Sequence, residues 1–290
     1  MPDSCLKVKT YASGAVDVAP PFRYAATMNR LSVYLDSAVS AALAAGRLQR
    51  SRFATDFAVD LKGAKDLVTE LDTASEALII GMLRQQFPDH GILAEEGQYP
   101  SGNGHHTWII DPIDGTTNFA HGFPWFCSSI ALEQEGQLLV GVIYNPMTDE
   151  LFTATAGGGA FLNGRRLRVS QRAPLVGALL GTGFPYDCAT HPENNFDHFI
   201  RFQKAARGIR RAGAAALDLA YLAAGRLDGF WEVKLKPWDV AAGTLLIQEA
   251  GGTVSSFDGS PYTVRNHRIL ASNGLIHHEM VAMLAQGATP

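Results

Sequence analysis

The stretch over residues 108–119, WIIDPIDGTTNF, constrains this chain more than any other part of its sequence. Its apolar start has the composition of a buried strand, and it leads into a turn rich in Pro, Gly and Thr that carries Asp111 and Asp114. A buried carboxylate without a partner is costly, because it loses its hydration or takes up a proton. Two acids at the exit of a core strand therefore predict a bound cation, and carboxylate oxygens suit a hard divalent metal.

The residues that follow favour an anion beside that cation. Gly115, Thr116 and Thr117 offer backbone N–H groups and hydroxyls at a predicted helix start, where an anion is stabilised. A metal beside an anion indicates a phosphate site. The alternative is a plain turn, because Asp-Pro and Asp-Gly pairs are ordinary turn chemistry and an isolated motif of this kind is more often structural. The interpretation depends on whether other acids converge on the same place.

Further acids fall at the ends of predicted elements. Asp72 lies three residues after Thr69 at a predicted helix start, so a capping box is the alternative to a functional role. Asp239 lies in the first turn of another predicted helix, where a helix cap explains it equally well. Glu95 and Glu96 end a short predicted strand, and adjacent strand residues point in opposite directions. Only one of this pair is therefore expected to face a shared site.

The apolar pattern predicts a mixed α/β chain. Antiparallel strands are expected at 128–132, 138–145 and 150–155, followed by a hairpin at Asn163-Gly164. Helices are expected at 29–50, 196–206 and 213–224, and a further helix is opened by residues 236–239 and closed by Gly251-Gly252. A last strand at 269–272 precedes a closing helix. We divide the chain into a poorly ordered extension (1–27), an α+β metal-binding half (28–165) and an α/β half that completes the site (166–290).

Composition argues against several classes of protein. A net charge of -4 and a pI near 6.1 argue against a broad nucleic-acid-binding surface. No apolar run in the sequence approaches the ~20 residues that a membrane helix needs. The 3 cysteines, Cys5, Cys127 and Cys188, lie far apart and are odd in number, which fits a reducing compartment better than a disulfide framework or a zinc site. A cytoplasmic location is therefore expected.

Four spaced motifs carry a family resemblance. They are DLVTELD at 66–72, EE at 95–96, DPIDGTTNF at 111–119, and WDVAAG at 238–243 running on to EAGG at 249–252. Together they resemble the inositol monophosphatase family, within a superfamily of lithium-sensitive, Mg²⁺-dependent sugar phosphatases. GTGFPY at 181–186 and the Arg210-Arg211 pair before LDLA at 217–220 are similar to its bacterial branch. The resemblance spans residue 28 to the C-terminal helix. It implies a layered αβαβα sandwich of the inositol monophosphatase and fructose-1,6-bisphosphatase type, usually a homodimer.

The resemblance also implies two or three Mg²⁺ ions per active site and their ligands. Glu95, Asp111 and the carbonyl of Ile113 would hold the first ion, and Asp111, Asp114 and Asp239 the second. Glu95, with Asp72 through water, would hold a weaker third. A metal-activated water would then attack phosphorus directly, with no phospho-enzyme. An aspartyl nucleophile would need acids two residues apart, whereas Asp111 and Asp114 are three apart.

The same resemblance implies roles for other residues. Thr116, backed by Glu95 or Asp72, would take the proton from the attacking water. The N–H groups of Gly115 and Thr116 would hold the phosphate. The residues matching the substrate-binding positions are Asp114, Gly213, Ala215, Glu232 and Asp239. Ala214 departs from the pattern, because relatives commonly have Ser or Thr there, and this puts myo-inositol itself in doubt.

The expected function is hydrolysis of inositol 1-phosphate or a similar small sugar or polyol phosphate. Within the same fold, the alternatives are histidinol phosphate, fructose 1,6-bisphosphate, NADP and phosphoadenosine. An alternative of another class comes from bacterial relatives that bind the transcription elongation machinery, so RNA polymerase or RNA is a candidate partner. Only the short Arg pairs, Arg165-Arg166 and Arg210-Arg211, bear on that alternative.

Overall fold

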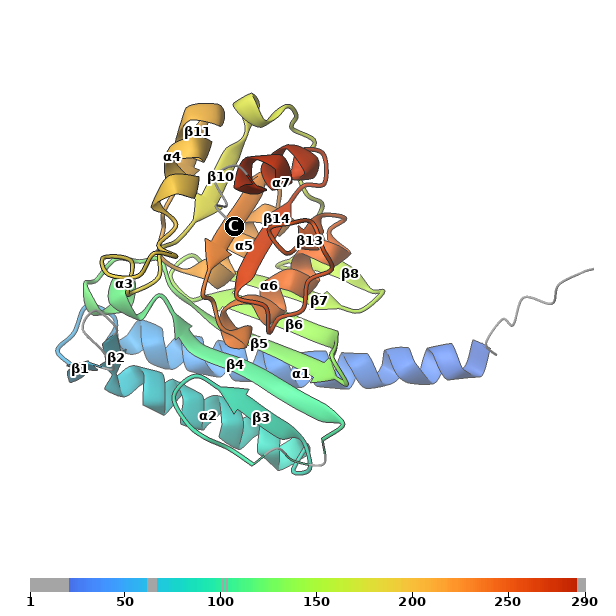
Figure 1. The fold of residues 1–290 in the computed structure, drawn as a ribbon. Coiled ribbons are helices and arrows are strands. Elements are labelled where there is room, and N and C mark those ends of the chain that lie inside the picture. The colour runs from blue at the N-terminus through green and yellow to red at the C-terminus, as the bar shows by residue number, and fades with distance from the viewer. Residues whose placement is uncertain (1–20, 62–66, 101, 103, 286–290) are drawn as a thin grey trace, which may run out of the picture.

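Figure 1 shows a stack of alternating helical and sheet layers in the computed structural model, which describes residues 21–61, 67–100, 102 and 104–285. The first layer consists of two helices, α1 (Pro21–Arg52) and α2 (Glu70–Gln86), that lie on one face of a seven-stranded sheet. The chain reaches α2 through a short antiparallel pair, β1 (Val59–Leu61) and β2 (Leu67–Thr69).

The large sheet has the strand order β3-β4-β5-β6-β7-β8-β9. Its strands are β3 (Gly91–Ala94), β4 (His106–Asp114), β5 (Cys127–Gln134), β6 (Gln137–Asn145), β7 (Glu150–Thr155), β8 (Gly159–Leu162) and β9 (Arg165–Arg166). Only β3 and β4 run parallel, and every later pair is antiparallel. A short helix, α3 (Thr116–Ala120), connects β4 to β5 and begins where the two aspartates end.

A second, five-stranded sheet has the order β11-β10-β12-β14-β13. Its strands are β10 (Leu179–Thr182), β11 (Gly208–Arg210), β12 (Gly229–Val233), β13 (Thr253–Ser255) and β14 (Arg268–Ser272), and a 3-10 turn, η1 (Leu175–Gly177), precedes β10. Two helices, α5 (Ala215–Ala223) and α6 (Pro237–Glu249), lie between the sheets. Two more, α4 (Phe196–Ala205) and α7 (His277–Ala285), cover the outer face of the small sheet.

Each interface between layers has its own apolar cluster. Ala38, Ile79 and Trp108 belong to the cluster between the first helices and the large sheet. The central cluster joins Phe152 of the large sheet to Leu246 of α6. Phe202, Trp231 and Met280 belong to the outer cluster. These clusters fill the interfaces between the layers that were expected from the family resemblance. The αβαβα sandwich is confirmed.

The start of the first helix bears on the N-terminal extension expected from the sequence. Helix α1 begins at Pro21, inside the segment 1–27 that we expected to be a poorly ordered extension. Proline suits a first helical turn, because its missing N–H would have no helical partner there. Residues 1–20, including Cys5, lie outside the described residues, while Cys127 and Cys188 are free thiols. The boundary at 165/166 stays a prediction, since the central cluster contains residues from both sides of it.

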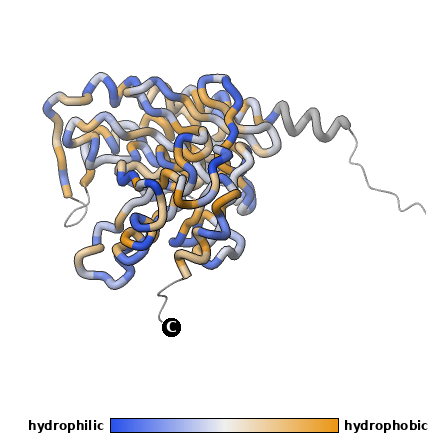
Figure 2. The backbone as a smooth tube through the Cα atoms, turned by 90° about the horizontal axis from the view of Figure 1, so that it is seen from above, coloured by the Kyte–Doolittle hydropathy of each residue, from blue (hydrophilic) through white to orange (hydrophobic). Residues whose placement is uncertain are grey.

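Hydrophilic and hydrophobic residues alternate along most of the chain, as the colours of Figure 2 show. This alternation is typical of elements with one buried face and one face in water. Within the described residues, no helix combines the length and the apolar character needed to span a bilayer.

Candidate active site

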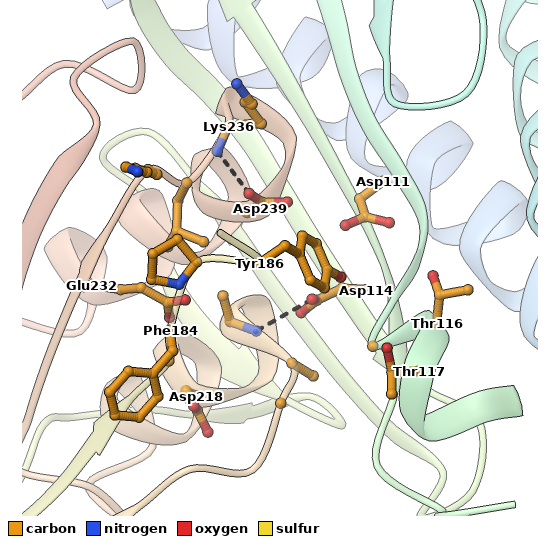
Figure 3. Close-up of a pocket in the computed structure, with 18 of the residues that line it drawn as sticks. Asp111, Asp114, Thr116, Thr117, Phe184, Tyr186, Asp218, Glu232, Lys236 and Asp239 are labelled. Atoms are coloured by element: carbon orange, nitrogen blue, oxygen red, sulfur yellow. Dashed lines mark hydrogen bonds between the residues drawn. The ribbon is translucent and has the colours of Figure 1, made fainter. Parts of the chain in front are cut away.

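Strand β4 brings Asp111 and Asp114 to the same side because its pairing with β5 is irregular between them. Residues three apart on a regular strand would point to opposite faces. Pro112 lies inside the irregularity, and it has no N–H to give to a ladder. Its carbonyl instead accepts hydrogen bonds from Gln49 Nε2 at 2.9 Å and Ser128 Oγ at 2.8 Å. This local kink turns both carboxylates into one cleft (Figure 3).

The cleft has a volume of about 660 Å³ and is formed by both halves of the chain. Its volume lies in the range of pockets that hold small ligands. It gathers most of the site residues expected from the sequence: Glu95, Asp111, Ile113, Asp114, Gly115, Thr116, Gly213, Ala215, Glu232 and Asp239. Glu95 lines the cleft and Glu96 does not, which confirms that only one of these glutamates faces it.

Asp72 is the expected site residue that does not line the cleft, but it contacts one that does. Its Oδ1 lies 2.9 Å from Thr116 Oγ1, which also lies 3.0 Å from the carbonyl oxygen of Ile113. A hydroxyl has one proton, so Thr116 donates to one of these acceptors at a time. Asp72 Oδ2 accepts from the backbone N–H of Thr69 at 2.8 Å, in a capping box at the start of α2. Asp72 is thus both a helix cap and a partner of the cleft.

Gly115 connects the aspartates to α3 in a conformation that favours glycine. Its φ is +97°, in the left-handed region. A Cβ at this position would also lie 3.0 Å from the carbonyl oxygen of Trp125. The turn from β4 into α3 therefore depends on the absence of a side chain at residue 115.

Asp111 is one of the most buried acids of the cleft, with 2 % of its surface exposed. Burial raises the pKa of Asp111 well above its usual range, and the negative charges of Glu95 and Asp114 raise it further. Its Oδ1 is buried and has no hydrogen-bond partner among the residues described. A cation would supply the missing partner and offset the mutual repulsion, so the donors fit a hard divalent metal. Among the residues that the structure describes, no group of three or more Asp, Glu, His or Cys side chains is arranged so that it could hold a metal ion. The ligand set therefore stays a prediction.

Asp114 joins the two halves of the cleft. Its Oδ1 accepts from the N–H of Ala215 at 3.2 Å, and its Oδ2 accepts from the N–H of Ala216 at 2.7 Å, at the start of α5. Burial raises the pKa of Asp114 to about 7, while the hydrogen bond from Ala216 acts in the opposite direction. Asp239 makes a local contact instead, because it accepts from the N–H of Lys236 at 2.7 Å and caps the start of α6 (Figure 3).

The far wall of the cleft contains residues for which no role was expected from the sequence. Asp218 of α5 is 2 % exposed and lines the cleft beside Glu232 and Arg211. Burial raises the pKa of Glu232 well above its usual range, and the charge of Asp218 raises it further, whereas Arg211 lowers it. Residues 183–187 complete this wall. The motifs GTGFPY at 181–186 and LDLA at 217–220, together with the Arg210-Arg211 pair, marked this wall in the sequence without indicating a role for Asp218.

The layered α/β fold and the acids that line the cleft fit the class of phosphatases that the sequence motifs resemble. The chain belongs to the inositol monophosphatase family, because the model of that family, described as "Inositol monophosphatase family", matches residues 30–289. The site residues expected from the family resemblance, with the exception of Asp72, line the cleft.

The alignments with known relatives cover most of this chain and nearly the whole length of each relative. The chain is 46% identical over 253 residues to an inositol-1-monophosphatase of Mesorhizobium japonicum, covering 86% of this chain and 95% of the relative. It is 50% identical over 248 residues to the Nus factor SuhB of Pseudomonas aeruginosa, covering 82% and 91%. Among solved structures, an inositol monophosphatase from Anabaena aligns with a TM-score of 0.82 at 44% identity, covering 89% of this chain and 97% of that one.

Proposed function

We propose that this protein is a Mg²⁺-dependent phosphomonoesterase that hydrolyses inositol 1-phosphate or a similar small sugar or polyol phosphate. The observation that carries the proposal is the environment of Asp111. A buried carboxylate with an unpartnered oxygen, surrounded by other acids in one cleft, is unfavourable unless a cation binds there. The inositol-1-monophosphatases among the relatives support the substrate class.

Two or three Mg²⁺ ions are proposed to bind at this site, held by the carboxylates of Glu95, Asp111, Asp114 and Asp239 and the carbonyl of Ile113. Their oxygen donors and like charges suit Mg²⁺, which takes a few carboxylates and completes its shell with water and substrate phosphate. When bound, the metal supplies positive charge that stabilises the phosphate in the transition state and makes water more acidic.

The residues of the chain itself would carry the proton and orient the substrate. Thr116 takes the proton of the attacking water as its own hydroxyl proton moves to Asp72 Oδ1, which lies 2.9 Å away. The N–H groups of Gly115 and Thr116 orient the phosphate. Substrate hydroxyls are held by Asp114, Glu232 and Asp239, and by the backbone of Gly213 and Ala215, all of which line the cleft.

A phosphate-release panel tests this proposal. Purified full-length protein is incubated with inositol 1-phosphate, histidinol phosphate, fructose 1,6-bisphosphate, NADP and phosphoadenosine, each with Mg²⁺ and with a chelator. We expect release from inositol 1-phosphate or another small polyol phosphate, dependent on Mg²⁺. No release from any substrate with Mg²⁺ present would reject the phosphatase proposal, and equal release with the chelator would reject the metal.

A second role is suggested by the relatives called Nus factor SuhB, one of which is 50% identical to this chain. We infer that the protein is also a candidate partner of RNA polymerase or its RNA. Affinity purification of the tagged protein from its native cells tests this, and recovery without enrichment of polymerase subunits would count against it. Light scattering of the purified protein tests whether it is a homodimer. Cell fractionation tests the cytoplasmic location.

A further inference from the structure

Glu95 lies in a turn that folds back onto one buried carboxylate of α2. After the end of β3, the N–H of Glu96 donates to Glu76 Oε2 at 2.8 Å. The hydroxyl of Tyr99 donates to Glu76 Oε1 at 2.7 Å. Glu76 is only 2 % exposed, so both of its oxygens are used inside the protein, and both are bound to the same turn.

The turn is shaped for this contact. A Cβ at Gly97 would lie 2.6 Å from the Tyr99 hydroxyl, so a side chain at residue 97 would displace the Tyr99 ring from its present position. The Tyr99 ring also lies 5.2 Å from the guanidinium of Arg84 in the same helix. The residues from Glu96 to Tyr99 are thus held against α2 at two points, Glu76 and Arg84.

The burial of Glu76 is not offset by an ion pair within the described residues. No Lys or Arg forms an ion pair with it in the described part of the chain. A buried carboxylate of this kind stabilises the fold less than an apolar side chain of similar size would. Its hydrogen bonds are therefore expected to serve a purpose other than stability. Glu76 follows Asp72 by four residues, so both lie on one face of α2. Asp72 contacts Thr116, and Glu76 contacts the turn of Glu95.

We propose that Glu76 is a positioning residue that sets the direction in which the Glu95 side chain enters the cleft. The N–H of Glu96 and the carbonyl of Glu95 belong to one planar peptide unit. Anchoring that N–H therefore fixes the ψ angle of Glu95. It also fixes the direction in which the backbone leaves β3 beside the cleft. The inference rests on the proposed function, in which Glu95 is a Mg²⁺ ligand.

Mg²⁺ binding to the metal-free, full-length protein tests the inference, measured by calorimetric titration without substrate. Glu76→Ala is expected to weaken Mg²⁺ binding about 10–100-fold, the usual effect of losing a residue that orients a metal ligand. Glu76→Gln keeps an oxygen that can accept the Glu96 N–H, so it is expected to recover most of the affinity. Equal losses in the Ala and Gln variants would overturn the proposal.

Tyrosine variants provide a matched comparison that does not depend on the folding of Glu76→Ala. Tyr99→Phe removes one of the two hydrogen bonds to Glu76 and is expected to weaken Mg²⁺ binding by a smaller factor. Tyr144→Phe is the control, because the Tyr144 hydroxyl likewise donates to a carboxylate, that of Asp149 at 2.8 Å, outside the cleft. We expect no change in Mg²⁺ affinity there.

Equal Mg²⁺ affinity in the two tyrosine variants, or wild-type affinity in a folded Glu76→Ala protein, would overturn the inference alone. A wild-type protein that binds no Mg²⁺ would overturn both the proposed metal site and the inference. A wild-type protein that binds Mg²⁺ but releases no phosphate from any substrate would reject the phosphatase activity, and the Glu76 comparison would still be decided by the titrations.

Discussion

At the scale of single residues, a substitution at Asp111 is expected to reduce activity without reducing the stability of the protein. Asp111→Asn removes a carboxylate proposed to bind two metals, so we expect turnover to fall by at least about 100-fold, since loss of an outer partner alone can cost that much. The metal-free protein should be no less stable, because the change removes a buried charge from among other acids. Phosphate release and thermal unfolding measured on one preparation check both expectations. Near-normal turnover would contradict the metal assignment.

His90 is expected to make stability depend on pH. Its ring is stacked on that of His106, with centroids 4.7 Å apart, and its Nδ1 is buried without a partner among the described residues. Burial, and then the charge of His106, lower the pKa of His90 to about 4. An unfolded histidine takes up a proton near pH 6.5. Between these values the unfolded state binds more protons, so the contribution of His90 to stability is lost as pH falls.

His90→Phe should remove that contribution while keeping a ring in the stack. We expect the variant to gain stability relative to wild type as pH falls from about 6.5 to about 4, the interval between the unfolded and folded pKa values. Urea unfolding at several pH values measures the difference. His278→Phe, at an exposed position of α7, is the control. A constant difference between His90→Phe and wild type over this range would contradict the prediction.

At the scale of elements, the entry into α3 depends on Gly115. Gly115→Ala forces a side chain into left-handed backbone and against the carbonyl of Trp125, so we expect the protein to lose about 1–2 kcal/mol of stability from the backbone alone, and more from the clash. Gly122→Ala, just beyond the same helix, is the matched control, because Gly122 has a φ of +67° but open space around it. Denaturant unfolding of both variants gives the comparison. Equal losses would mean that packing at Gly115 is unimportant.

Elements with a strong local signal could be predicted from the sequence. The strand expected at 150–155 is β7 (Glu150–Thr155), and the Asn163-Gly164 turn joins β8 to β9. Strands β11 and β13 were missed, because each has only three residues and depends on pairing with a neighbour in the sheet. Such short segments carry too little periodicity to be recognised.

For the candidate site, too, only residues with a strong local signal could be predicted from the sequence. The acids of the four motifs were found because the type and spacing of their residues indicate metal chemistry. Asp218 was missed because its apolar neighbours in α5 are typical of a buried scaffold helix. Glu76 was missed because a glutamate in a helix is usually solvated, and only the tertiary fold brings the turn of Glu96 onto it.

At the scale of the whole molecule, the two proposed halves, 28–165 and 166–290, share their central cluster. Phe152 from the first half and Leu246 from the second belong to one buried set. Arg265 also crosses between the halves and donates to both oxygens of Glu133, at 2.8 and 2.9 Å. The halves should therefore unfold together. We expect one calorimetric transition whose van't Hoff and calorimetric enthalpies agree. Two separate transitions would show that the halves are independent domains.

The cleft has one wall from residues 95–118 and another whose residues come mainly from 182–187 and 211–239. In evolutionary terms, the two walls can change at different speeds. The first wall, together with Asp239 of the second, holds the proposed metal ligands, so selection for activity restrains these residues. The rest of the second wall, which includes Phe184 and Tyr186, would face what is attached to the phosphate. Descendants of such a protein can acquire new substrates while inheriting the same chemistry.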